Sequence, residues 1–168
     1  MQNAKDTFYT LLQQRLAALN PARTVVVRGQ TRPAVLVDEN ELPSAAVLTD
    51  TFRLDWTALQ VDAAHPLPLV TMQCAIRYAT DGTTGNAGMD RGRALAAMDG
   101  ELLSALTAAP HSTPKLQFTE AGAGSTPATL ATRIFWADPV FGPCEVAAER
   151  LTRTTTVQVL AYQEAGEL

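Results

Sequence analysis

The chain has 168 residues, of which 46% are hydrophobic and 18% are charged. This length is typical of one domain and is sufficient to bury a real core, so we expect a single domain over residues 1–168. The formal net charge is -4, and the 13 basic residues are scattered from Lys5 to Arg153. An acidic chain without a basic cluster is not expected to bind nucleic acid specifically through phosphate contacts.

The sequence carries no signal for a membrane or for secretion. No stretch approaches the roughly 18 apolar residues of a bilayer-spanning helix, and the N-terminus lacks the apolar core of a signal peptide. We therefore expect a protein that stays in the cytoplasm in which it is made. Cys74 and Cys144 are accordingly expected to be reduced thiols, not a disulfide.

The first predicted element is an amphipathic helix over residues 6–19. Apolar side chains recur there at helical spacing, polar residues occupy the other side, and Asn20-Pro21 ends the pattern. The predicted buried stripe consists of Phe8, Leu11, Leu12, Leu16 and Leu19.

Short extended segments follow this helix. Residues 23–28 and 34–37 are rich in valine and flank a turn-like QTRP, which predicts a hairpin between them. The acidic run 38–41 indicates a surface loop. Residues 52–61 suit a strand, although Trp56, Leu59 and Ala63 would also suit a short helical turn.

The clearest strand covers residues 70–78 and follows the extended, proline-rich segment 65–68. Its residues alternate strictly between two faces, so one face is expected in the core and the other wet or at an interface. The first face carries Val70, Met72, Cys74, Ile76 and Tyr78, and the second carries Thr71, Gln73, Ala75 and Arg77.

A second, longer central helix is expected after the glycine-rich segment 81–88, which favours a flexible connection suited to partner contacts. Asn86 or Asp90 would cap this helix, and Pro110 closes it. Its predicted buried stripe consists of Leu95, Met98, Leu102, Ala105 and Leu106.

The last third predicts three strands, at residues 116–119, 132–136 and 154–162, with a flexible loop at about 121–129. The order of elements predicts an α+β fold. In that fold a mixed, mostly antiparallel sheet is packed by the N-terminal helix and the longer central helix.

The residues that carry chemistry lack the partners that catalysis or metal binding needs. His65 and His111 each stand beside a proline with no metal ligand at a suitable spacing. No nucleophile elbow is present, and Cys74 lies in the middle of a strand. We expect no catalytic centre, no metal site and no cofactor. The aromatic residues Trp56, Phe135, Trp136 and Phe141 are expected in the core or in a subunit interface.

The order of segments resembles that of the tail-terminator and tail-completion proteins of long-tailed phages, which join tail to head. The resemblance rests on the helix DTFYTLLQQRLAAL, a strand pair after Arg23, the strand PLPLVTMQCAIRYAT, a glycine-rich connection and the helix RALAAMDGELLSAL. The resemblance is one of hydrophobic pattern and covers roughly the first two-thirds of the chain. The segment after Pro110 is longer than the family pattern and departs from it.

The resemblance implies a structural virion protein at the head-proximal end of the tail, made in the bacterial cytoplasm. Such a protein forms a ring, usually of six copies, that caps the tail tube, ends its polymerisation and contacts the tail-tube protein and the head-proximal connector. We expect the contacts in the loops 81–88 and 121–129 and on the wet face of the long strand. The candidate interface residues are Arg77, Asp81, Thr83, Thr84, Asn86, Arg91 and Arg93.

Two other classes of function stay open at this point. One is a small-molecule-binding or enzymatic α/β domain with a cleft near Trp56 and His65. The other is a cytoplasmic protein-interaction adaptor, which the sequence alone leaves open.

Overall fold

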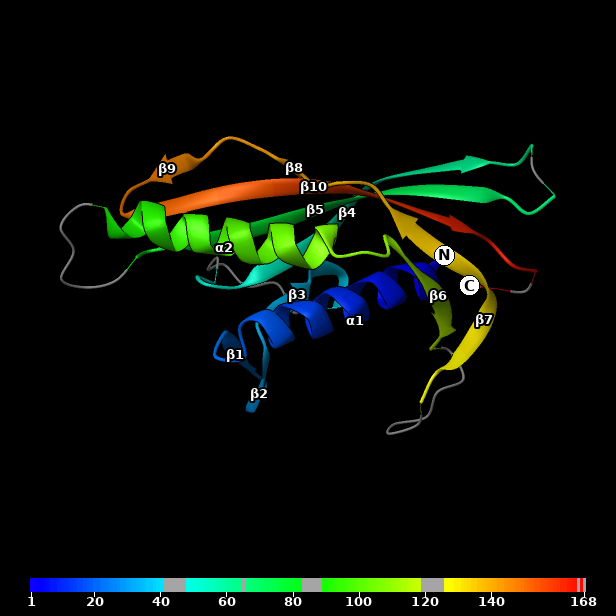
Figure 1. Ribbon diagram of the computed structural model, residues 1–168, viewed down its shortest axis with the longest axis horizontal. Coiled ribbons are helices and arrows are strands. Elements are labelled where there is room, and N and C mark those ends of the chain that lie inside the picture. Colours follow the sequence, from blue (N-terminus) through cyan, green and yellow to red (C-terminus); the bar gives the residue numbers. More distant parts are fainter. Residues whose placement is uncertain (41–47, 65, 83–88, 119–125, 166, 168) are drawn as a thin grey trace.

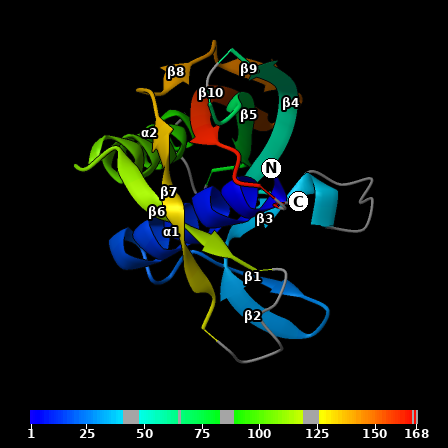
Figure 2. The same cartoon turned by 90° about the vertical axis from the view of Figure 1, so that its right-hand side faces the viewer.

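The fold consists of one large sheet, two helices on one of its faces, and a separate small hairpin (Figures 1 and 2). The computed structural model describes residues 1–40, 48–64, 66–82, 89–118, 126–165 and 167. Its elements are α1 (Gln2–Leu19), β1 (Thr24–Val27), β2 (Gln30–Pro33), β3 (Val35–Val37), the 3-10 turn η1 (Asp38–Asn40), β4 (Phe52–Asp62), β5 (Leu69–Thr80), α2 (Asp90–Thr107), β6 (Ser112–Gln117), β7 (Ala128–Trp136), β8 (Val140–Phe141), β9 (Glu145–Ala147) and β10 (Arg150–Tyr162).

The main sheet has the strand order β3-β4-β5-β10-β7-β6, and β8 and β9 also pair with β10. All its pairings are antiparallel except that of β3 with β4. The predicted α+β fold with a mixed, mostly antiparallel sheet is therefore confirmed. The long strands β4, β5 and β10 lie side by side, and α2 packs on β5 and β10, whereas α1 packs on α2 and on the strands β3, β6 and β7.

Helix α1 begins earlier than its hydrophobic pattern predicts, at Gln2, because polar residues of the first turn are also buried. The hydroxyl of Thr7 donates to the carbonyl of Asn3 at 2.6 Å within the helix. The predicted stripe is partly wrong, since Leu19 is half exposed at the last turn. Asn20 and Pro21 end the helix as expected.

Helix α2 buries the five side chains that its spacing predicts, from Leu95 to Leu106. Its expected cap is wrong, because Met89 takes the N-cap position and makes no side-chain capping bond, while Asp90 is the first helical residue. Asn86 lies outside the described residues. Both helices have 18 residues, so α2 is not the longer of the two.

The predicted hairpin between residues 23–28 and 34–37 is also wrong. Strand β1 pairs instead with β2, which is the QTRP segment, and Val27 faces Gln30 across a two-residue turn. Arg28 and Gly29 form this turn with positive φ angles of 51° and 77°, as the tight turns of β-hairpins require. The chain therefore reverses before Pro33, and β3 is free to join the main sheet beside β4.

The strands of the last third are longer than predicted. Ala128 and Thr129 belong to β7 instead of the expected loop, and residues 121–125 lie outside the described part. Strand β6 begins at Ser112 and accommodates Pro114 because it is an edge strand, where a missing N–H is tolerated. The N–H groups of Leu116 and Phe118 donate to the side chains of Thr7 and Asn3 of α1, so α1 covers this edge.

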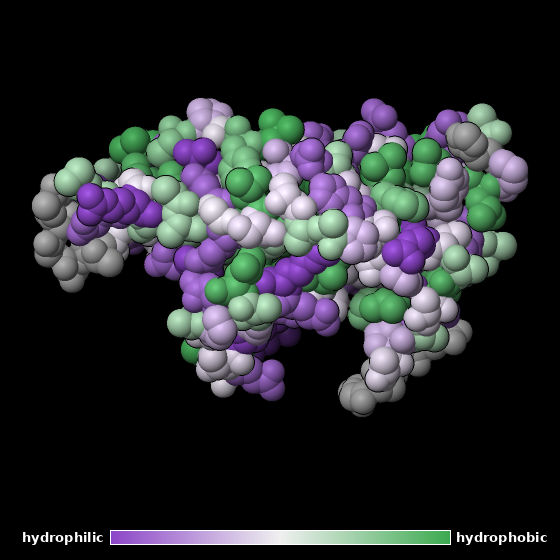
Figure 3. Space-filling view, in the orientation of Figure 1, coloured by the Kyte–Doolittle hydropathy of each residue, from purple (hydrophilic) through white to green (hydrophobic). Residues whose placement is uncertain are grey.

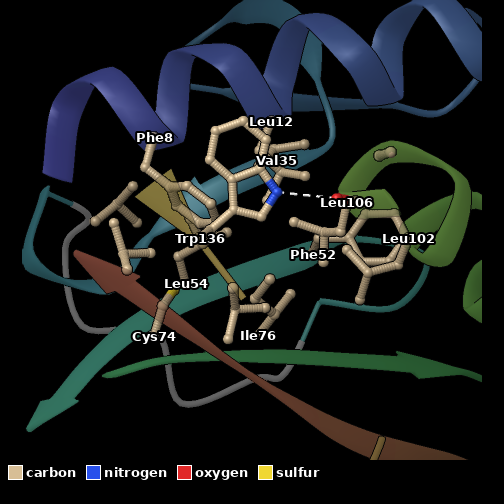
Figure 4. Packing of buried hydrophobic residues seen from close by; sticks show 14 of the residues in the cluster. Phe8, Leu12, Val35, Phe52, Leu54, Cys74, Ile76, Leu102, Leu106 and Trp136 are labelled. Atoms are coloured by element: carbon tan, nitrogen blue, oxygen red, sulfur yellow. Dashed lines mark hydrogen bonds between the residues drawn. The ribbon is translucent and has the colours of Figure 1, made fainter. Parts of the chain in front are cut away.

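The core is centred on aromatic side chains between α1 and the sheet (Figure 4). Phe8 contacts the rings of Trp56 and Trp136 edge-on, with ring centres 6.0 and 6.1 Å apart. The indole N–H of Trp136 donates to the carbonyl of Leu106 at 2.9 Å. A single indole therefore joins β7, α1 and the last turn of α2.

Arg15 fastens the two helices to one another. Its guanidinium donates to the carbonyls of Ala105 and Ala108, at 2.8 and 3.0 Å, at the C-terminal end of α2. It also lies 5.1 Å from the centre of the Trp136 ring. The positive charge thus satisfies carbonyls that have no helical partner and complements the negative end of the α2 dipole.

We expect Arg15→Met to lower the free energy of unfolding by about 2 kcal/mol, because it keeps the apolar stem but removes the hydrogen bonds and the cation–π contact. Urea unfolding followed by circular dichroism measures this change. Arg93→Met is the matched control, since Arg93 is exposed on α2 and its loss should change stability by less than about 0.5 kcal/mol. Equal effects of both substitutions would contradict the role given to Arg15.

Candidate functional site

The face of the main sheet opposite the helices is open and polar. Gln73 and Arg77 are exposed there, as the alternation of β5 predicts, whereas Ala75 is buried. A shallow groove of about 360 Å³ crosses this face. Its lining includes Gln60, Thr71, Gln73, Asp138, Thr156 and Gln158. The groove offers amides and hydroxyls with one carboxylate, and Ala58, Ala137 and Val140 add apolar surface beside them. It is shallow, whereas the pockets that bind small molecules bury most of the ligand's surface.

Arg77, the first of the predicted interface residues, is neutralised within the chain. Its guanidinium lies 2.6 Å from a carboxylate oxygen of Asp38 and 3.3 Å from one of Asp55. Arg53 contacts Asp38 as well, at 2.6 Å. The predicted solvated acidic loop is thus partly wrong, because Asp38 lies in η1 and joins two strands. Glu41 lies outside the described residues.

Asp81 and Arg91, two further predicted interface residues, lie near one another at the end of β5. Asp81 accepts hydrogen bonds from Arg150 at 2.7 and 3.0 Å, which lower the pKa of its carboxyl group. Arg91 packs against Gly82, whose φ is 73°, and lies 3.5 Å from Glu149. The partners are Arg150, the first residue of β10, and Glu149 directly before it, so sequence spacing could not reveal them. Arg93 is exposed on α2, and Thr83, Thr84 and Asn86 lie outside the described residues.

A buried polar cluster between α2 and the sheet is the strongest candidate for chemistry. The phenol of Tyr78 donates to Asp99 at 2.5 Å and lies 3.2 Å from the hydroxyl of Thr155. Burial and the hydrogen bond to Asp99 raise the pKa of Tyr78 above its ordinary range. The phenol is therefore a fixed donor and not a base. The cluster lies on the helix side of the sheet, away from the open groove, so its geometry suits docking of α2.

A second buried charge, Lys115, was missed by sequence reasoning because nothing in its neighbourhood marks it as internal. Its side chain is fully buried and donates to the carbonyl of Tyr162 and to Glu167, both at 2.5 Å. The N-terminal amino group lies 3.7 Å from Glu167. This ion pair joins Glu167 to β6 and lies beside the N-terminal amino group, and a buried cation requires such pairing.

The residues proposed for a ligand cleft do not form one in the described part of the chain. Trp56 packs against Phe8 and under Lys5, whose ammonium is 5.6 Å from the ring centre, and it does not line the groove. His65 lies outside the described residues. His111 is partly exposed and stacks on Trp136.

Metal ligands and membrane helices are also not found among the described residues. No group of three or more histidine, cysteine, aspartate or glutamate side chains there could hold a metal ion. No helix in the same part of the chain has both the length and the apolar character needed to cross a bilayer.

The most exposed large hydrophobic side chains of the described residues are three valines on short strands. Val26 of β1, Val140 of β8 and Val146 of β9 are 68%, 69% and 73% exposed. Each strand is paired on one side only among the described strands. Unpaired strand edges with apolar side chains are templates for another polypeptide, so these segments are the candidate functional surfaces.

The two candidate surfaces lie on opposite sides of the molecule. The β1–β2 hairpin projects on the helix side, whereas β8 and β9 lie beyond the sheet, and both ribbon views agree (Figures 1 and 2). In the space-filling view the underside is hollowed between the projecting β1–β2 hairpin and the end of the β6–β7 pair (Figure 3). Sequence reasoning missed both surfaces, because β2, β8 and β9 are too short to produce a strand pattern.

Comparison of the sequence with known protein families and with curated proteins gave no match.

The two thiols should differ sharply in reactivity. Cys74 is fully buried, and burial raises its pKa, whereas Cys144 is exposed. We expect one thiol to react with Ellman's reagent in the native protein and two after unfolding in urea. In Cys144→Ser the native protein should give none, and rapid reaction of Cys74 in that variant would contradict its placement in the core.

Stability should fall at alkaline pH. Both Tyr78 and Cys74 have folded-state pKa values above their ordinary values, which are about 10 for tyrosine and about 8.5 for cysteine. Their contribution is complete below those values and is lost as pH rises above them, because the unfolded chain then ionises more readily. We expect the urea midpoint to fall between pH 8 and pH 11, and Tyr78→Phe to reduce that fall. An unchanged fall in Tyr78→Phe would contradict the role of the phenol.

Proposed function

We propose that this protein is a structural subunit that assembles with copies of itself into a ring, and that the ring caps a phage tail tube. In this role it ends tube polymerisation and joins the tail to the head-proximal connector. The observation that carries the proposal is the pair of unlike strand edges with exposed valines on opposite sides of the molecule. A polypeptide partner is the natural cover for such edges.

The placement of these edges favours a ring over a simple dimer. When two different surfaces of identical subunits meet, each contact leaves one free surface of each kind, so addition continues. Growth stops only if the rotation per subunit closes the chain into a ring. A closed ring of fixed size is a suitable device for ending a tube, because it offers the tube one face and the connector the other.

The charge distribution suits a ring through which DNA passes. Eight of the basic side chains in the described residues form ion pairs with carboxylates, which leaves few cations for phosphate groups. These are Lys5, Arg23, Arg53, Arg77, Arg91, Lys115, Arg150 and Arg153. A surface that does not bind phosphate groups lets a DNA duplex slide through the ring.

The resemblance in segment order supplies the phage part of the proposal, and the fold is compatible with it. The predicted sheet, its wet face and the stripe of α2 are present in the described residues. The side chains that could take part in catalysis are instead engaged in packing or in ion pairs. This favours a structural role over an enzymatic one. The tail-tube protein and the connector are the partners that the proposal names.

We expect the purified protein to form rings that negative-stain imaging resolves and native mass spectrometry counts. Added to a polymerising tail-tube protein of the same phage, it should bind tube ends and shorten the tubes. Tube protein alone is the control and should give long tubes of variable length. A monomer at high concentration that neither forms rings nor binds tube ends would refute the proposal.

A further inference from the structure

We infer that the β1–β2 hairpin of one copy docks on the β8–β9 edge of the next copy and adds its strand β1 to that edge. The inference names the contact between subunits in the proposed ring and rests on that proposed function. The occupant of the β8–β9 edge is therefore a second copy of this chain.

Both segments have the form that strand addition needs. Strand β1 has the sequence TVVV, pairs with β2 alone among the described strands and exposes Val26. Within the same part of the chain, β8 and β9 pair with β10 alone and expose Val140 and Val146. Strand addition would pair unpaired backbone groups on both sides and cover valines from both partners.

The other outer strand of the main sheet, β6, does not compete, because α1 covers its free edge. The N–H groups of Leu116 and Phe118 already donate to Thr7 and Asn3. Strand β3 is fully buried, and its Val35 carbonyl accepts from Tyr9. The outer strands β6 and β3 are thus covered by other parts of the chain, whereas the β8–β9 edge is open to a neighbouring subunit.

Charge complementarity selects the β1–β2 hairpin as the occupant. Residues 24–33 contain two arginines, Arg28 and Arg32, and no carboxylate. Residues 138–149 contain three carboxylates and no lysine or arginine. The side chains of Asp138 and Glu149 are 79% and 88% exposed, although they lie 3.7 Å from His111 and 3.5 Å from Arg91, and Glu145 is exposed as well. Two surfaces of opposite charge attract one another, whereas two copies of either surface repel, so the contact joins unlike surfaces.

The turn of the β1–β2 hairpin gives a second indication that this hairpin contacts another subunit. Arg28 has a φ of 51° at the first turn position, where asparagine, aspartate or glycine is favoured and a long side chain is strained. Arg28 is also exposed, and no ion pair in the described residues involves it. A strained residue with an exposed charge suits a contact outside its own chain.

Cysteine cross-linking tests the contact directly. In a Cys144→Ser background, Val26→Cys and Val146→Cys are made separately and together, while Cys74 stays buried. A short bis-maleimide cross-linker should join the two single variants only when they are mixed, and should convert the double variant into a ladder of oligomers. Leu103→Cys is the control, because Leu103 is 46% exposed on α2 outside the contact, and it should not cross-link with Val146→Cys.

Removal of the charge provides an independent readout. Arg28→Asn suits the turn, so the fold should be retained or slightly stabilised, yet self-association should weaken by about three- to tenfold. Arg28→Glu should weaken it further, and Glu145→Arg in the same chain should restore it. Arg133→Gln, at an exposed position of β7, should leave association unchanged. Sedimentation velocity measures all four variants.

The outcomes separate this contact from the proposed function. Rings that form without cross-links between positions 26 and 146, and whose stability does not depend on Arg28, would overturn the contact and leave the ring intact. Cross-linking of Val26→Cys with itself would also overturn it, because it would indicate pairing of like surfaces. A protein that stays monomeric under all conditions would overturn both.

Discussion

The apolar face of β5 is the constraint on which the rest of the structure depends. Five side chains from Val70 to Tyr78 point to one face and are buried, and no strand of this length can remain in water with such a face exposed. The two helices exist as stable elements because they cover it. Helix α2 is not a strong helix former by itself, since it contains Gly92 and Gly100 and has no side-chain cap. Tertiary packing therefore supplies most of the stability: α2 packs on β5 and β10, and α1 packs on α2, β3, β6 and β7.

Polar contacts then fix how the helices lie on this apolar floor. Arg15 joins α1 to the end of α2, Asp99 joins α2 to Tyr78 of β5, and Glu101 joins α2 to Arg23 beyond the end of α1. Each of these contacts connects residues that are far apart in the sequence. Apolar burial determines that the helices cover the sheet, and these directional bonds determine their angle and register.

The parts of the fold that could be predicted are those governed by local periodicity. The stripe of α2 and the apolar face of β5 follow from spacing alone, and both agree with the structure. On the other face of β5, Gln73 and Arg77 are exposed as predicted, but Ala75 is buried. The error at the first hairpin has a local cause as well: Arg28-Gly29 is a turn, but arginine is not a usual turn residue, so the proline-containing QTRP was a more persuasive turn signal. The candidate surfaces could not be predicted, because β8 and β9 exist only through their pairing with β10. The carboxylates near Arg77 and Arg91 are brought there by the fold, and not by sequence proximity.

The cover that α1 places over β6 has a consequence for how the protein behaves at high concentration. A sheet with two open outer strands can add further sheets at both sides, which is the route to fibrils and amorphous aggregates. Here Asn3 and Thr7 occupy the outward N–H groups of Phe118 and Leu116, so that side of the sheet is closed to addition. A few hydrogen bonds from the first two turns of a helix therefore close one side of the sheet to further strands, so association through this side is disfavoured at high concentration.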